Sequence, residues 1–484
     1  MTRVVLSGIL GGLLLLPPAA SLAEAAGPAL LAQQQPVSPQ QKIVSPRSPV
    51  LERTPCPAAS DKGKPAQVSR NGNREPVSGA PADCAPTDEP RRFNVTFNGL
   101  NRIRLAVVES VAHLDANEPV TRSEVERAAR RIESIPGVSD ARVVYLPSEN
   151  GTAVVTVDMT ERSRIPRGFA GWATVGGRGA LSDEARVDIA NLTSYGEVWS
   201  VGYRWSGPRE RLMARLEVPV RHVPGIVSIE GLIEHQTYRP AIAGVMFAGT
   251  EFEGENLVQR RRRIGVQVSD WAAGWWRWMG GAAFDSIGER GYLGADAGVD
   301  VRVARDHVSL MVVTGFWSPM NAGDPFASAM TALAWRSSTE DTPISFYGEV
   351  GISAVTTYTP LAVWPGSHTS AERGGSLRAH PLRESDVITG DVFGRRVMFG
   401  SVTSEQLLKA TKFGRFSIAE FMDTGRAWKR LPGLPPSPFH VDIGVGLRLA
   451  GSKAGGTVRL DIAHGVRDGR NHFSAGFVKG WPGR

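Results

Sequence analysis

From residue 167 to the end of the chain, apolar and polar residues alternate with a period of two. In RERLMARLEVPV, residues 209–220, leucine, alanine and valine alternate with arginine and glutamate. EVWSVGYRWSG, residues 197–207, alternates large apolar residues with serine, glycine and arginine in the same way. A strand of this kind suits lipid on one face and water on the other. About 16 such segments, separated by Gly, Pro, Asp or Asn turns, predict a mostly β fold in which residues 167–484 form a transmembrane antiparallel β-barrel.

Aromatic and basic residues fit the same interpretation. We expect an interfacial aromatic girdle at Trp271, Trp275, Trp276 and Trp278. The run Arg260–Arg263 is expected at a solvated strand end, with alternate arginines facing the lumen. A large soluble β-sandwich or propeller is the alternative. Arginines that alternate directly with large apolar residues, and the lack of a blade-like repeat, argue against it.

Residues 91–163 have a different pattern and predict a small α+β domain of order β-α-α-β-β. RRFNVTFNGL alternates like a half-buried strand, and the next 14 residues carry apolar side chains at helical spacing. A second helix is predicted over residues 121–134, because Thr121 and Glu124 have the spacing of a capping box. Its buried stripe is expected at Val125, Ala128, Ala129 and Ile132. ARVVYLP and TAVVTVDMT then predict two closing strands.

The N-terminus predicts export. Arg3 precedes an apolar run, Val4–Leu16, and Ala23-Glu24-Ala25 offers small residues for cleavage, so residues 1–25 read as a signal peptide. A membrane anchor is the alternative, but that run is shorter than the roughly 18 residues a spanning helix needs. No later segment reaches that length either, which excludes a helical membrane protein. Residues 26–90 are rich in Pro and Ala and are expected to form a disordered periplasmic leader.

Charge and cysteine content add little. The net charge of +7 leaves nucleic acid, anionic lipid and acidic partners open, but the pattern favours a membrane and we expect no nucleic-acid partner. Cys56 and Cys84 are expected to form a local disulfide in an oxidising compartment, with free thiols as the alternative. The sequence has no nucleophile elbow, Walker loop or zinc-helix motif, so we expect no enzyme activity, no cofactor and no metal.

Residues 91–162, which end in IPGVSDARVVYLPSENGTAVVTVDMTER, resemble a POTRA domain. POTRA domains are periplasmic polypeptide-transport modules that precede an outer-membrane barrel. Five C-terminal segments, from GGSLRAHPLRESDVITGD to GTVRLDIAHGVRDGRNHFSAGF, are similar to the closing strands of the outer-membrane barrel-assembly and two-partner-secretion transporter superfamily.

In that superfamily a long extracellular loop folds into the lumen, and an arginine at its tip contacts an aspartate of an F-x-D-x-G strand. The resemblance places this tip at Arg378 and its carboxylate partner at Asp423, with a further acidic residue at Glu405 on the preceding strand. Our strand count places the loop between the eleventh and twelfth strands. The other motif positions are Gly374, Gly375, Leu377, Ala379, His380, Phe421 and Gly425.

Elementary electrostatics supports the same pairing. A guanidinium in a narrow lumen is partly desolvated and needs a carboxylate, so removal of one partner would strand a charge. An ordinary exposed loop arginine is the alternative. Ala379 and His380 stand where the family has glycine and an aromatic residue, which indicates a divergent member.

The resemblance implies an outer-membrane polypeptide-transport protein, with its N-terminal region in the periplasm, that inserts or assembles proteins into the outer membrane. Export of one specific protein through the lumen is an alternative, and a passive pore or structural protein is another. The implied partners are an unfolded β-rich polypeptide, outer-membrane lipid and accessory assembly subunits.

Overall fold

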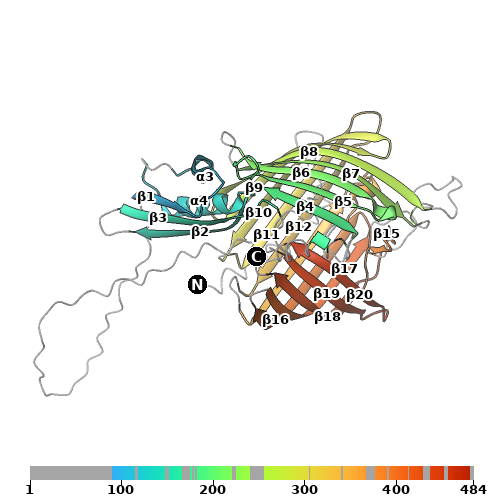
Figure 1. Ribbon diagram of the computed structural model, residues 1–484. Coiled ribbons are helices and arrows are strands. Elements are labelled where there is room, and N and C mark those ends of the chain that lie inside the picture. Colours follow the sequence, from blue (N-terminus) through green and yellow to red (C-terminus); the bar gives the residue numbers. More distant parts are fainter. Residues whose placement is uncertain are drawn as a thin grey trace, which may run out of the picture.

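The computed structural model describes residues 90–114, 118–147, 152–165, 175–176, 179, 183–220, 225–239, 242, 256–304, 306–338, 342–366, 377–389, 392–411, 414–428, 436–451 and 456–479. These residues form a small α+β domain beside one end of a β-barrel (Figure 1). Within this part of the chain, no helix is long and apolar enough to cross a membrane. The predicted signal peptide, most of the predicted leader, and both cysteines lie outside the described residues.

The α+β domain has the predicted element order. Its elements are β1 (Arg92–Asn98), α3 (Leu105–Ala112), α4 (Arg122–Ser134), β2 (Val138–Pro147) and β3 (Thr152–Glu161). The sheet order is β1-β3-β2, with β1 parallel and β2 antiparallel to β3. One apolar core joins the two helices to the inner face of the sheet.

Local sequence explains why α4 forms where it does. Thr121 and Glu124 make the reciprocal capping box that was predicted, which satisfies backbone N–H groups at the helix start. The predicted stripe of Val125, Ala128, Ala129 and Ile132 is buried against the sheet.

The barrel is closed and contains 17 strands in the described part of the chain, of which two have only two residues. The longer strands are β4 (Glu184–Ala190), β5 (Val198–Arg204), β6 (Arg211–Pro219), β7 (Ile226–Tyr238), β8 (Leu257–Ala273), β9 (Trp276–Ile287), β10 (Arg290–Val303), β11 (Val308–Pro319), β12 (Phe326–Arg336), β13 (Ile344–Val355), β16 (Arg396–Thr411), β17 (Gly414–Trp428), β18 (His440–Gly451), β19 (Gly456–Gly465) and β20 (Asn471–Lys479). The expectation of about 16 strands is close to these fifteen.

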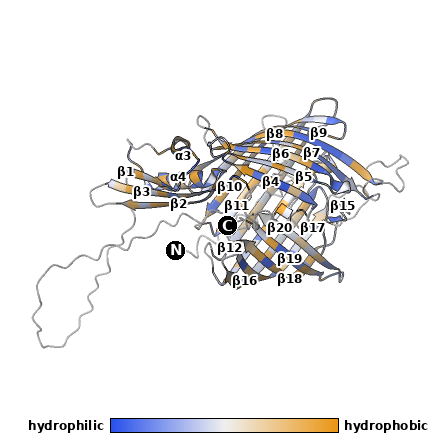
Figure 2. Ribbon diagram, in the orientation of Figure 1, coloured by the Kyte–Doolittle hydropathy of each residue, from blue (hydrophilic) through white to orange (hydrophobic). Residues whose placement is uncertain are grey.

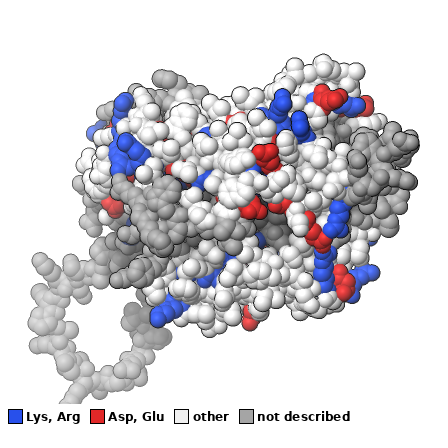
Figure 3. Space-filling model, turned by 45° about the vertical axis from the view of Figure 1, so that its right-hand side comes forward, with Lys and Arg blue, Asp and Glu red and all other residues white. Residues whose placement is uncertain are grey.

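The alternation predicted from sequence is the alternation of outward and inward side chains. On β5, Trp199, Val201 and Tyr203 are exposed outward, while Ser200 and Arg204 are buried on the inner side. Figure 2 shows hydrophobic and hydrophilic residues interleaved along the strands, and Figure 3 shows large uncharged areas on the barrel wall. An apolar outer wall with a polar interior is the arrangement of a transmembrane barrel.

The long segment between β13 and β16, residues 356–395, is the lumen loop. It contains the 3-10 helix η2 (Leu361–Val363) and the short strands β14 (Arg383–Glu384) and β15 (Val387–Ile388). β13 pairs directly with β16, so the wall is continuous without the loop. β15 instead bridges to β7 on another part of the barrel, where Ile388 pairs with Tyr238. The loop therefore crosses the interior, and it follows the tenth long strand of the described residues rather than the eleventh.

Two apolar clusters fix the loop to the barrel, and we call the loop residues in these clusters (Leu361–Trp364, Leu382, Ile388 and Phe393) the loop root. In one cluster Leu361, Trp364, Leu382, Ile388 and Phe393 pack with Tyr238 and Ile242. In the other, Ala362 and Val363 pack with Ile287, Tyr292, Trp317 and Phe326 from β9 to β12. The loop lies at the barrel end opposite the α+β domain, because hairpin turns alternate between the two ends.

The prediction of an aromatic girdle was wrong for Trp271. Trp275 is exposed, but Trp271 is 3% exposed and lies under the α+β domain. Its indole N–H donates to Ser134 Oγ over 2.9 Å, and the guanidinium groups of Arg130 and Arg302 lie over its ring. Trp271 is therefore an interdomain contact. The expectation for Arg260–Arg263 was right, since Arg261 and Arg263 face inward and both pair with Asp285.

Candidate functional site

The tip of the lumen loop, Leu377–His380, is buried against β17, β18 and β19. Arg378 is 5% exposed, and its Nε lies 3.5 Å from Asp423 Oδ2 on β17 and 3.8 Å from Asp461 Oδ2 on β19. Its guanidinium carbon lies 3.7 Å from the centroid of the Phe421 ring. The predicted pair of Arg378 and Asp423 is thus in contact, within a site that also holds a second carboxylate and an aromatic face.

Strand geometry explains the spacing of the F-x-D-x-G motif. Phe421, Asp423 and Gly425 are two residues apart on β17, so all three face the lumen. Phe421 stacks on the guanidinium and Asp423 supplies charge. A side chain at Gly425 would place Cβ 2.9 Å from Leu377 Cδ1, so the glycine leaves room for the loop. Leu377 is fully buried beside Val392, Val397 and Ala427.

Buried charges surround the tip. Arg448 Nη1 lies 2.5 Å from Asp461 Oδ1, and Arg459 Nη1 lies 3.8 Å from Asp461 Oδ2. Ser401 on β16 donates its hydroxyl to Asp423 Oδ1 over 2.7 Å. Arg378 therefore joins a network in which each charge has an opposite charge or a hydrogen-bond donor nearby, as burial demands.

Glu405 is not the acidic partner that was expected. It is half-buried on β16, and the ion pairs of Arg378 among the described residues go to Asp423 and Asp461. Glu405 lies opposite Ala419 in the register, whereas Ser401 lies opposite Asp423. Glu405 is displaced by two inward positions along the strand, and Asp461 supplies the second carboxylate.

His380 makes a polar anchor at the position where the sequence resemblance predicts an aromatic residue. Its Nδ1 lies 2.7 Å from Asp442 Oδ1 and its Nε2 lies 2.8 Å from Asp468 Oδ2. The Ala379 N–H donates to Asp442 Oδ2 over 2.6 Å, so one carboxylate holds two consecutive tip residues. Burial lowers the pKa of the His380 imidazole, but hydrogen bonds and charge from Asp442 and Asp468 outweigh burial, and the pKa is raised above its ordinary value.

Several of these residues were missed from sequence. Asp442, Asp461 and Asp468 had no assigned role, and His440, whose ring lies 4.1 Å from that of His380, had none either. A signal existed only for Asp442 and Asp461, because each is an acidic residue at an inward position of an alternating strand. Gly374 and Gly375 lie outside the described residues.

The far side of the loop is held by β7 and β8. Arg383 Nε donates to Gln236 Oε1 over 3.2 Å, and Gln236 Nε2 donates to the Asp386 carbonyl over 3.2 Å. The Ala362 N–H donates to Gln259 Oε1 over 2.8 Å. Together with the contacts of its tip, these bonds make the loop a bridge across the lumen from β7 and β8 to β17, β18 and β19.

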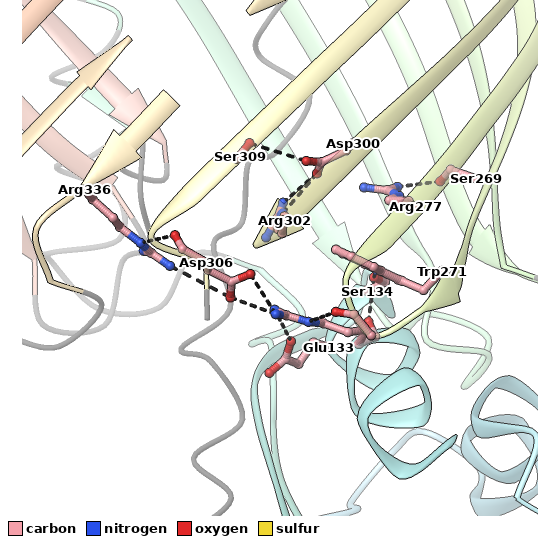
Figure 4. A network of polar contacts seen from close by, with 12 residues as sticks. Glu133, Ser134, Ser269, Trp271, Arg277, Asp300, Arg302, Asp306, Ser309 and Arg336 are labelled. Atoms are coloured by element: carbon pink, nitrogen blue, oxygen red, sulfur yellow. Dashed lines mark hydrogen bonds and ion pairs between the residues drawn. The ribbon is translucent and has the colours of Figure 1, made fainter. Parts of the chain in front are cut away.

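At the opposite end of the barrel, α4 docks through buried ion pairs, and Figure 4 shows the contacts around Asp306. Arg130 Nη2 lies 2.7 and 2.8 Å from the two carboxylate oxygens of Asp306, in the β10–β11 turn. Arg131 binds both oxygens of Asp270 on β8 over 2.9 and 2.5 Å. Two adjacent helix residues thus hold two different parts of the rim, and Arg131 does so with the two-nitrogen fork geometry that defines an orientation.

Glu133 belongs to the same interface. Its carboxylate lies 3.9 Å from Arg130 Nη1. Burial raises the pKa of the Glu133 carboxyl well above its ordinary value, although the charge of Arg130 opposes this. The interface therefore shifts the protonation equilibrium of this carboxyl group toward the neutral form.

Comparisons with known proteins show similarity of fold without similarity of sequence. No family model and no curated protein matches the chain. CdiB from Escherichia coli matches with a TM-score of 0.55 and 10% identity over 80% of this chain and 76% of that one. BamA from Haemophilus ducreyi lacking POTRA domains 1–3 matches with a TM-score of 0.47 and 11% identity, over 80% and 84% of the two chains. CdiB from Acinetobacter baumannii matches with a TM-score of 0.48 and 10% identity, over 80% and 73%. At this identity the likeness shows the fold alone, and the chain is a divergent barrel with the fold of E. coli CdiB.

Proposed function

We propose that this chain is an outer-membrane polypeptide-transport protein that inserts or assembles proteins into the outer membrane. Three features support the proposal. The barrel exterior is apolar, a loop bridges the lumen, and a small α+β domain is docked by buried ion pairs at one rim. In this proposal the α+β domain serves as a POTRA domain and lies in the periplasm.

The packing of the loop root is the observation that carries the choice of insertion over secretion. Leu361, Leu382 and Ile388 are fully buried, and Trp364 is nearly so, in contact with Tyr238 of the wall. Exposure of one such side chain costs about 1.5–3 kcal/mol, so release of the whole root is expensive. Insertion through the wall leaves the root in place, whereas passage of a chain through the lumen requires it to move.

The α+β domain offers a means of receiving the client. β2 is an edge strand, since among the described strands it pairs with β3 alone. An exposed edge binds an extended polypeptide through backbone hydrogen bonds and tolerates varied sequences. An unfolded β-rich client fits this mode of binding. Accessory assembly subunits have room on the same domain, whose outer face is not covered by the barrel (Figure 1).

Export through the lumen is the second candidate, and the polar interior favours it. Inward charges such as Arg261, Asp285, Arg302 and Asp300 form pairs along the wall, which keeps the lumen compatible with water and with a polar chain. The loop tip makes ionic contacts to Asp423 and Asp442, for which a charged client can compete.

Depletion of the protein, followed by quantitative profiling of the outer membrane and of the culture medium, tests the proposal. Insertion predicts loss of several resident barrels from the outer membrane. Secretion predicts loss of one exported protein from the medium with the resident barrels unchanged. Restoration by the wild-type chain is the control. If neither profile changes, the transport proposal fails and a passive pore or structural role remains.

A further inference from the structure

A group of metal-ligating side chains surrounds His380 at the loop tip. Ligand atoms of His380, His440 and Asp468 all lie within 4.8 Å of one another. The three residues come from three separate segments: the lumen loop, the first residue of β18, and the turn between β19 and β20. Nothing in the transport proposal uses His440 or Asp468.

We propose that His380, His440 and Asp468 form a binding site for Zn²⁺ or a chemically similar divalent transition-metal ion. Two imidazoles and one carboxylate are ligands that Zn²⁺ prefers, and three protein ligands leave a fourth position for water. Ligand atoms around a bound Zn²⁺ lie roughly 2.0–2.2 Å from the metal, so the group must contract slightly by side-chain rotation.

Asp442 is placed to orient the histidine. Its Oδ1 lies 2.7 Å from His380 Nδ1, so the proton on Nδ1 points to Asp442 and Nε2 faces Asp468 and His440. A carboxylate that holds the distal ring nitrogen of a ligating histidine fixes its tautomer and makes the other nitrogen a better ligand. The Ala379 N–H, which donates to the second oxygen of Asp442, holds that carboxylate in place.

The site can be reached from solvent. A Cβ at Gly465 would lie 2.5 Å from Asp468 Oδ1 and 2.8 Å from His380 Cε1, so the glycine leaves room for both ligand side chains. His380 and His440 are buried, but the Asp468 side chain is 43% exposed at the barrel end opposite the α+β domain. A hydrated ion from that side can therefore reach Asp468 first.

Binding would replace the hydrogen bond between His380 Nε2 and Asp468 with two bonds to the metal. Any proton held on Nε2 would leave to solvent, and no electron is transferred. The bound ion would tie the loop tip to β18 and to the β19–β20 turn, at a point separate from the contact between Arg378 and Asp423. Divalent metal on that side of the membrane would thereby control how readily the tip leaves the wall.

Direct measurement of Zn²⁺ binding tests the site. The full chain, purified in detergent and stripped with EDTA, would be titrated with Zn²⁺ in competition with a chromophoric chelator. We expect one Zn²⁺ per chain, and we expect His440→Ala and Asp468→Asn each to weaken binding by at least about tenfold. His464→Ala is the matched control, because His464 is on β19 beside Gly465 but is exposed on its opposite face.

A second measurement guards against misfolded variants. Co²⁺ in place of Zn²⁺ should give the visible absorption bands of a four-coordinate site in the wild type and in His464→Ala, and lose them in His440→Ala. Each variant would be checked for a folded barrel by circular dichroism. The proposal fails if the folded wild type binds no stoichiometric Zn²⁺, or if His440→Ala and His464→Ala bind it equally. Since metal binding is measured directly, this outcome is separate from success or failure of the transport proposal.

Discussion

Replacement of Arg378 by alanine is the sharpest test of how the loop is held. Arg378→Ala removes the guanidinium from between Asp423 and Asp461 and from the face of Phe421. Asp461 keeps Arg448 at 2.5 Å, so its charge stays paired, whereas Asp423 loses the cation nearest to it and is fully buried. Breaking a buried pair costs about 3–5 kcal/mol. Because only one carboxylate is stranded, we expect the lower end, about 3 kcal/mol.

A loss of about 3 kcal/mol lowers the docked-to-released ratio of the tip by roughly a hundredfold, since 1.4 kcal/mol corresponds to a factor of ten. Single-channel recording in planar bilayers would detect it as longer and more frequent open states than in the wild type. Limited proteolysis should cut the variant faster within the loop. Salt should change the wild type little, because the pair is buried and screening acts mainly on exposed charges.

The double variant Arg378→Ala with Asp423→Asn provides the decisive comparison. If the cost arises from a stranded carboxylate, neutralising Asp423 in the alanine background restores part of the docked population, and the two changes are not additive. Arg426→Ala is the matched arginine control, because Arg426 is on β17 but faces outward and donates to the Ser437 carbonyl. Strictly additive effects, or an Arg378→Ala variant with wild-type conductance, would refute the reasoning.

Three further predictions concern the loop and the domain interface. Gly425→Val should displace Leu377 from its buried position and cost about 1–3 kcal/mol in detergent thermal unfolding, whereas Gly231→Val, with no atom near its Cβ position, should cost much less. Arg131→Ala should strand its buried carboxylate partner on β8 and free the α+β domain from the rim, as seen by increased hydrogen exchange in α4. Docking of the domain should weaken as pH rises above about 4.5, because the pKa of Glu133 is raised in the docked domain and deprotonation then opposes docking. In the same hydrogen-exchange measurement, Glu133→Gln should make docking less dependent on pH.

Matched control variants distinguish these specific effects from a general loss of stability. Arg122→Ala removes a half-exposed pair with Glu126 on the same helix and should change exchange in α4 very little. Equal effects of Arg122→Ala and Arg131→Ala would contradict the role given to the buried pair. Docking that strengthens as pH rises would contradict the sign derived for Glu133.

The sequence alone was sufficient for those parts of the fold that depend on local periodicity. The outward and inward faces of β5, the capping box of α4 and the β-α-α-β-β order of the first domain were all predicted and are all present. Each of these features depends on residues that are close together in the sequence, so the local pattern is enough to predict it. The contact of Arg378 with Asp423 was also predicted, but through a resemblance to a family rather than through periodicity.

Tertiary structure alone decided which inward-facing groups meet. Asp442 and Asp461 meet the loop tip because the pairing of β17, β18 and β19 sets their positions, while the register of β16 with β17 displaces Glu405. Asp468 reaches the tip from the turn between β19 and β20. His440 and His380 are far apart in sequence and share no spacing motif, so the local sequence did not predict that their rings would be in contact. The sequence predicted Trp271 as a girdle residue, and only the docked position of α4 shows that it is an interdomain contact. Local sequence determines which way a side chain faces, but its partners depend on strands and loops that only the closed barrel brings together.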